Sequence, residues 1–300
     1  MKLVVVQLAV ALGLLVVHGC GNQPEQPAQN PTSDNANIQK SIKNNTPPIS
    51  LDSTHNHQGT TSQSPSPPET TTAKLTSTPQ VSSTQGVPLE IQVKNQAGKP
   101  VEKFATPQEK PMHMIVVSDD LRFFNHIHPD YQGQGKFAIK HDFPAPGNYT
   151  LFTDYQPSGQ REQVSVEKIS IPGDVPLPSS LETFSDTQTV GNTKVQLKTS
   201  PSQLKSGQQS KFSFSLIDTV SKKPVTDLQT YLGRQAHLVI IRSSSPLTAN
   251  DYIHVHSLNT ETKSEIQFQS QLPQKGTYKM WLQFQRQGKI TTVPFWINVN

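Results

Sequence analysis

Two His-x-His pairs stand out in the sequence because each would place two metal-binding side chains on one face of a strand. His126 and His128 lie in the segment NHIHP, and His254 and His256 lie in YIHVH. Residues two apart on a β-strand point to the same side, so each pair presents two imidazoles together. Neutral imidazole nitrogen is a common ligand for zinc, copper and nickel ions. Metal binding is therefore the first chemistry that the spacing indicates.

A third histidine precedes each pair, at the start of an apolar segment that reads as a strand: HMIVV in one case and HLVII in the other. Antiparallel pairing of position 113 with 128, and of 237 with 256, would bring three imidazoles to one face of each hairpin, because directly opposed residues share a face. The sequence thus predicts two three-histidine sites, each with an open coordination position. Their residues are His113, His126, His128 and His237, His254, His256.

Copper or zinc is the cofactor that such sites favour. The single cysteine, Cys20, precedes both repeats, so neither can supply the thiolate of a blue-copper site. Met112 and Met114 flank His113, whereas His237 has no methionine beside it, so thioether ligation is not a shared feature. The alternative function is a metal-free adhesion or scaffold module that binds protein or glycan, with the histidines serving only to join the strands of a hairpin.

Catalysis is not predicted. The sequence contains no GxSxG, no HExxH and no phosphate-binding glycine loop, and no acidic pair recurs between the two histidine regions. A three-histidine zinc site can activate water, but no repeated carboxylate lies near either group to act as a base. We therefore expect a binding protein and not an enzyme.

The segments that carry the histidines belong to an internal duplication. Gly98–Val101 (GKPV) matches Lys222–Val225 (KKPV) 124 residues later, and Met112–Val117 matches Ala236–Ile241 at the same offset. The offset is 128 at the His-x-His pairs, and it grows only between features, where loops tolerate insertions. His141 has no counterpart in the second copy and is expected at the surface.

Each copy is expected to form an immunoglobulin-like β-sandwich, which makes the fold all-β. The second copy shows about seven short strand-like segments separated by Gly, Pro, Asn and Ser, without a helical period. Tyr149 and Tyr278 each follow a glycine by two residues and are candidate corner tyrosines. The expected strands are 194–199, 211–217, 237–242, 252–256, 265–269, 277–285 and 291–299.

The expected domains are repeat 1 at residues 72–172 and repeat 2 at residues 186–300, joined by the Pro- and Ser-rich segment Ile171–Asp186. With the GKPV-type turn and the Gly-x-Tyr strand in each copy, the chain resembles secreted bacterial immunoglobulin-like modules of the YtkA or FixH kind. The resemblance covers about 90 residues per repeat. It implies a membrane-associated or metal-handling protein and names no ligand.

The N-terminal residues predict export. The apolar run Leu3–Val17 is broken only by Gln7 and is shorter than the roughly 20 residues that cross a bilayer. It is typical of a signal peptide, here residues 1–19. The following Val17-His18-Gly19-Cys20 resembles a bacterial lipobox, although His18 departs from the small or aliphatic residue of that motif. The resemblance implies lipidation of Cys20; the alternative is an ordinary secretory signal with a chance cysteine.

Residues 20–71 combine that cysteine with a segment rich in Asn, Gln, Pro, Ser and Thr, and they predict a disordered tether. The protein is therefore expected to be exported and anchored to a membrane on its periplasmic or extracellular side. Nucleic acid is not an expected partner, because the 26 basic and 22 acidic residues are interspersed and the net charge is only +4. The expected partners are the membrane, through the lipid anchor, and a metal-handling protein or a cell-surface partner.

Overall fold

The computed structural model describes residues 70–76, 84–175, 184–258 and 265–300, all within one compact unit, Ser62–Asn300. The signal peptide, the lipidation at Cys20 and the tether, except for its last two residues, lie outside the described residues, as does half of the expected linker. No helix in the described part of the chain is long and apolar enough to span a bilayer.

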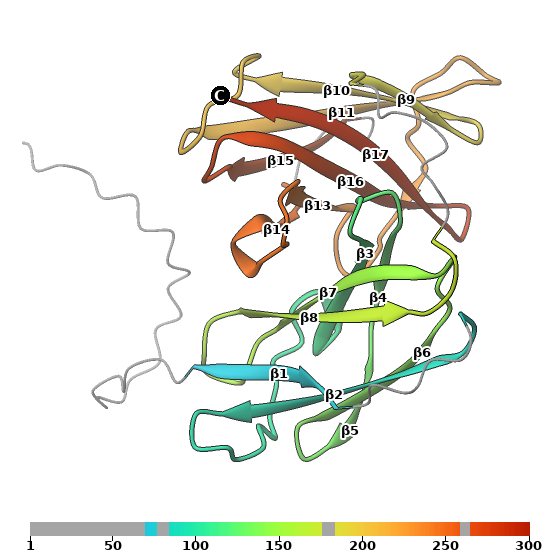
Figure 1. Ribbon diagram of the computed structural model, residues 1–300. Helices are drawn as coiled ribbons and strands as arrows, with labels where there is room; N and C mark the ends of the chain where they lie inside the picture. The colour runs from blue at the N-terminus through green and yellow to red at the C-terminus, as the bar shows by residue number, and fades with distance from the viewer. Residues whose placement is uncertain (1–69, 77–83, 176–183, 259–264) are drawn as a thin grey trace, which may run out of the picture. The chain divides into compact units, whose positions relative to one another are not determined.

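The first repeat forms two antiparallel sheets that face each other across an apolar core (Figure 1). One sheet has the strand order β1-β2-β6-β5 and the other has the order β4-β3-β7-β8. The strands are β1 (Thr71–Leu75), β2 (Val87–Asn95), β3 (Met112–Ser118), β4 (Phe124–Ile127), β5 (Asp130–Gly133), β6 (Lys136–His141), β7 (Gly147–Tyr155) and β8 (Gln163–Ile171).

The second repeat has the same two-sheet architecture. One sheet has the order β15-β11-β10-β9, and the other has the order β12-β16-β13-β14, with β17 also paired to β16. The strands are β9 (Thr187–Val190), β10 (Thr193–Ser200), β11 (Gln209–Asp218), β12 (Leu228–Gln229), β13 (Ala236–Arg242), β14 (Tyr252–His256), β15 (Glu265–Gln271), β16 (Gly276–Arg286) and β17 (Lys289–Val299).

The prediction of an all-β fold with two tandem immunoglobulin-like β-sandwich domains is confirmed. All seven strands expected in the second repeat are present, within two residues at each end. The prediction missed β9 and β12, which are only four and two residues long. Both corner tyrosines are also confirmed, since Tyr149 Oη donates to the carbonyl of Ala145 at 2.8 Å and Tyr278 Oη to that of Gln274 at 2.7 Å.

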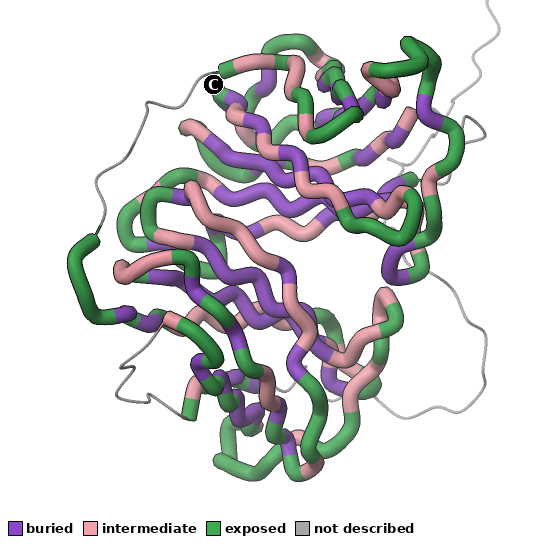
Figure 2. Tube along the Cα trace, turned by 90° about the vertical axis from the view of Figure 1, so that its right-hand side faces the viewer, coloured by how far each residue is buried: buried purple, intermediate pink, exposed green. Residues whose placement is uncertain are grey.

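Figure 2 shows that buried residues gather along the middle of the strands and exposed ones at the turns. Strand β3 is buried along nearly its whole length because its two faces contribute to two different apolar clusters. Met112, Met114 and Val116 face the core of the first sandwich. Ile115 and Val117 point the other way, into a cluster that also contains residues of the second repeat. A strand covered on both faces has a nearly continuous apolar sequence instead of an alternating one.

Strand β13 repeats this arrangement. Leu238 and Ile240 belong to the core of the second sandwich, and Val239 and Ile241 join the cluster shared by the two repeats. The sheets that contain β3 and β13 therefore each have an inner face toward their own sandwich and an outer face toward the other repeat. We call the shared cluster the inter-repeat cluster; it consists of Ile115, Val117, Leu121, Phe152, Val239, Ile241, Leu247, Tyr252 and Trp281.

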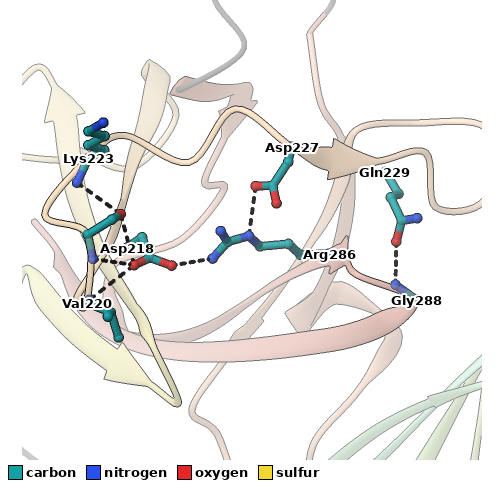
Figure 3. Close-up of polar contacts among 8 residues, drawn as sticks. Asp218, Val220, Lys223, Asp227, Gln229, Arg286 and Gly288 are labelled. Atoms are coloured by element: carbon teal, nitrogen blue, oxygen red, sulfur yellow. Dashed lines mark hydrogen bonds and ion pairs between the residues drawn. The ribbon is translucent and has the colours of Figure 1, made fainter.

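The end of β16 is tied to the end of β11 and to the loop before β12 through one arginine. Figure 3 shows the Arg286 guanidinium between two carboxylates, with Nη1 2.9 Å from Asp218 Oδ2 and Nε 2.7 Å from Asp227 Oδ1. Asp218 also accepts from the backbone N–H groups of Val220 and Ser221. These bonds hold the pKa of the Asp218 carboxyl well below its usual range, with the backbone bond from Ser221 as the largest cause. The network fixes the KKPV-type turn and the β16–β17 hairpin.

Candidate metal centre

The hairpin register expected for the histidines is the one observed. In the second repeat His237 pairs directly with His256, and Val239 pairs with His254. In the first repeat Met114 pairs with Ile127 and Ile115 with His126, and the same register carried one pair further brings positions 113 and 128 opposite each other. All six histidines therefore lie on the outer faces of their sheets, beside the inter-repeat cluster.

The structure brings each expected triad together. One ring nitrogen from each of His113, His126 and His128 lies within 4.8 Å of the other two, and the same holds for the second triad. We call the first triad site 1 and the second triad, His237, His254 and His256, site 2. Within site 1 the ring centroids are 4.7–5.2 Å apart.

The two sites also lie close to each other. The His254 ring of site 2 has its centroid 5.5 Å from that of His113 and 5.7 Å from that of His126. The centroids of His126 and His237 are 6.2 Å apart. The six imidazoles thus form one cluster between the repeats, an arrangement that the sequence did not indicate.

Backbone carbonyls set the tautomer of the first histidine in each triad. His113 Nε2 donates to the carbonyl of Pro107 at 3.2 Å, and His237 Nε2 donates to that of Tyr231 at 3.0 Å. A carbonyl oxygen can only accept, so in each neutral ring Nε2 carries the proton and Nδ1 carries a lone pair. The two carbonyls occupy equivalent places, 124 residues apart.

Side chains of the opposite repeat set the tautomer of the second histidine. Gln283 Oε1 accepts from His126 Nδ1 at 2.9 Å, and Asp154 Oδ2 accepts from His254 Nδ1 at 3.2 Å. In the neutral form of each ring Nδ1 therefore carries the proton, and Nε2 is left with a lone pair. Such an outer partner is what metal-ligating histidines almost always have.

His256 Nδ1 lies 3.4 Å from Gln108 Nε2, an amide nitrogen that can only donate. Six other triad nitrogens meet one another or have no hydrogen-bond partner among the described residues.

The closest of these contacts lies in site 1. His113 Nδ1 and His126 Nε2 lie 3.0 Å apart, and the proton of each ring is already engaged at its other nitrogen. Four further buried nitrogens have no hydrogen-bond partner among the described residues: His128 Nε2, His237 Nδ1, His254 Nε2 and His256 Nε2. Buried polar atoms without a partner are uncommon and call for a ligand or another explanation.

Burial favours the neutral form of five triad imidazoles, those of His113, His126, His128, His237 and His256. It lowers the pKa to about 4 for His113 and His256, and to about 3 for His128 and His237. Repulsion between two protonated rings lowers the pKa of each of these four further, as a smaller cause, with His254 as a shared neighbour. Metal ligation requires the neutral form, so the ligands are ready at neutral pH.

The sequence missed the residues that support the triads. Asp154 and Gln283 are both 5% exposed, and they pair across the sheet with His113 and His237 respectively. They occupy equivalent positions 129 residues apart. A polar residue at the same place of a long apolar strand in both copies is the signal that could have identified them.

The expectation that His141 lies at the surface is wrong. Its side chain is 5% exposed, with the ring edge-to-face on Phe143 at 4.7 Å between centroids. The apolar rings around it account for the burial, and they lie in the core of the first sandwich. His141 belongs to neither triad.

Comparison with known proteins identifies a domain family. A family described as a domain of unknown function (DUF8832) matches residues 67–169 and 188–300, one segment for each repeat. No curated protein matches the chain significantly. The predicted resemblance to YtkA or FixH modules is not tested by these matches and stays a prediction.

Solved structures of β-sandwich proteins align with the chain only loosely. A Salmonella alpha-2-macroglobulin mutant is 9% identical, with a TM-score of 0.25, and the alignment covers 79% of this chain and 15% of that one. A two-domain fibronectin type III segment of chicken tenascin is 10% identical, with a TM-score of 0.22 and coverages of 77% and 98%. Bacterial invasin, an integrin-binding protein, is 11% identical, with a TM-score of 0.22 and coverages of 75% and 39%.

Proposed function

The chain belongs to the DUF8832 domain family, and we propose that it is an exported, lipid-anchored protein that binds copper or zinc, with one ion at each three-histidine site. Its role would be to capture or deliver the metal outside the cytoplasmic membrane. Because no carboxylate recurs beside both triads among the residues that the structure describes, the proposal is for a binding protein and not for an enzyme.

The observation that carries the proposal is the pair of facing nitrogens in site 1. Two lone pairs 3.0 Å apart, at His113 Nδ1 and His126 Nε2, repel each other unless a cation lies between or beside them. Two ligands bound at 2.0–2.1 Å to one tetrahedral metal are roughly 3.3 Å apart. The observed spacing of 3.0 Å is slightly shorter than this and is close to that of two ligands on a shared ion.

The second support is that four of the six buried side-chain atoms without a hydrogen-bond partner in the described part of the chain are triad nitrogens; the other two are His141 Nε2 and Gln108 Oε1. An adhesion module would gain nothing from burying four imidazole nitrogens without partners, since each such group costs about 1–3 kcal/mol. A bound ion offsets that cost.

Metal titration of the purified, metal-free protein tests the proposal. We expect about two equivalents of Cu(II) or Zn(II) per chain, measured by calorimetry and by elemental analysis after gel filtration. The double variant His126→Ala/His128→Ala should lose one equivalent and retain the other. His141→Ala is the matched control, because it removes a buried histidine outside both triads and should still bind two equivalents.

The same titration can reject the proposal. If the parent protein binds no metal at micromolar concentrations, or if the double variant binds as much as the parent, the histidines are structural elements of the hairpins. The metal-free adhesion or scaffold module, with protein or glycan as its partner, would then be the better function.

A further inference from the structure

We infer that Asp154 and Gln283 are positioning residues that each orient a metal ligand of the opposite repeat, and that they make the two sites unequal, with site 2 the tighter. This inference rests on the proposed function. Its basis is that the second histidine of each triad donates its outer hydrogen bond to the other repeat, and that one of the two acceptors is a carboxylate while the other is an amide.

Asp154 lies on β7 of the first repeat and reaches two residues of the second. Its Oδ2 accepts from His254 Nδ1 at 3.2 Å and from Tyr252 Oη at 3.3 Å. Tyr252 is 8% exposed and stacks on Phe152, with centroids 5.0 Å apart. The carboxylate is therefore held in place, and it directs His254 Nε2 toward the other ligands of site 2.

Gln283 lies on β16 of the second repeat and does the same for site 1. Its Nε2 donates to Thr292 Oγ1 at 3.0 Å, which sets the orientation of the amide. Oε1 is thereby left to accept from His126 Nδ1 at 2.9 Å. The geometry of this support matches that of Asp154, but the amide carries no charge.

The exchange of support between the repeats extends beyond these two residues. Phe124 of the first repeat stacks on Trp281 of the second at 4.7 Å, and Tyr252 of the second stacks on Phe152 of the first. Tyr252 is the counterpart of Phe124, 128 residues later, and Trp281 is the counterpart of Phe152, 129 residues later. Reciprocal contacts of this kind define an interface of approximate two-fold symmetry, so the cross-repeat bonds belong to a built interface.

The chemical difference between the two supports breaks this symmetry. A carboxylate that accepts from the distal nitrogen of a ligating imidazole raises the basicity of the ligand, and its negative charge stabilises a divalent cation nearby. Changing an outer partner of this type commonly alters metal affinity by about 10–100-fold. Site 2, supported by Asp154, should therefore fill before site 1, supported by Gln283.

The test uses two single-site proteins. His126→Ala/His128→Ala leaves site 2, and His254→Ala/His256→Ala leaves site 1. The affinity of each for Zn(II) is measured by competition with a chelator of known affinity. We expect site 2 to bind about tenfold or more tightly than site 1.

Substitution of the supporting residues then separates charge from position. Asp154→Asn keeps an oxygen acceptor but removes the charge. It should lower the Zn(II) affinity of the site 2 protein by about 10–100-fold. Asp154→Glu should recover part of the loss. Gln283→Glu should raise the Zn(II) affinity of the site 1 protein by about tenfold. Asp130→Asn, which removes an exposed carboxylate of the first repeat, is the matched control and should change neither affinity.

A spectroscopic readout excludes a purely structural effect. The Cu(II) electron paramagnetic resonance spectrum of the site 2 protein should change with Asp154→Asn, while that of the site 1 protein should change with Gln283→Glu. Equal affinities at the two sites, together with less than about a threefold response to either charge substitution, would overturn the inference while leaving metal binding intact. If neither single-site protein binds metal, the proposed function itself fails.

Discussion

Acid should destabilise the metal-free protein in a manner set by its buried imidazoles. The ordinary pKa of histidine is 6.5, whereas in the folded chain burial lowers it to about 4 for His113 and His256 and to about 3 for His128 and His237. Between these values the unfolded chain binds more protons than the folded one, so stability falls as the pH decreases. The stability that the neutral buried imidazoles contribute is fully present above about pH 6.5 and is lost progressively toward pH 3–4.

The magnitude follows from this window. Between pH 7 and pH 5 each of the four histidines lowers the free energy of unfolding by about 2 kcal/mol. For independent titration the four together lower it by on the order of 8 kcal/mol. A typical protein is stable by only 5–15 kcal/mol. All six histidines lie on the outer faces of their sheets, so separation of the repeats is the least costly way to hydrate them. We expect acid to open this interface before it unfolds either sandwich.

Two measurements check this expectation on metal-free protein. Trp281 is 3% exposed and stacks on Phe124 between the repeats, so its fluorescence should shift to the red between pH 6 and pH 4 while the far-ultraviolet circular dichroism is retained. Urea midpoints should fall over the same range, and His237→Gln should flatten the dependence. An urea midpoint and a Trp281 spectrum that both stay constant from pH 7 to pH 5 would refute the assignment of buried neutral imidazoles.

Three further predictions concern the metal, the anchor and the interface. Zn(II) at 100 times its Kd should stabilise the folded protein by about 2.7 kcal/mol per site, seen as a higher thermal midpoint that is absent once both triads are replaced by alanine. Cys20→Ser should move the protein from the membrane fraction to the soluble fraction or block its processing, and mass spectrometry showing an unmodified mature N-terminus at another residue would contradict the lipid anchor. Trp281→Ala should lower the free energy of unfolding by about 3–5 kcal/mol, measured by urea unfolding. It should also weaken the association of the two fragments that limited proteolysis near Pro176–Ser185 produces. Fragments that separate already in the parent protein would argue against a stable interface.

Local pattern was sufficient to predict the sandwich and the two triads. Strand-forming segments separated by turn residues predicted β10, β11 and β13–β17. The register of the hairpins followed from parity, because side chains alternate along a strand and a register slip of one residue moves every side chain to the opposite face. The duplication then predicted an equivalent three-histidine site in the second repeat.

The two triads were nevertheless predicted as separate sites, one in each independent repeat. The structure places them in one cluster, because the outer faces of β3 and β13 are apolar and pack against each other. The runs MIVV and LVII already indicated that both faces of each strand are covered, since the apolar residues of a strand with only one covered face would alternate with polar ones. Which surface covers the second face cannot be read from such a run.

The sequence by itself determined the duplication, the all-β fold and the three histidines that converge in each copy, because these depend on spacing along one hairpin. The tertiary structure alone decided that Asp154 supports a histidine 100 residues away and Gln283 one 157 residues away. Contacts between repeats depend on how two finished sheets pack, and that packing is set by the complementarity of whole faces. No periodicity along the chain encodes it, so the coupling of the two candidate sites became visible only in the folded molecule.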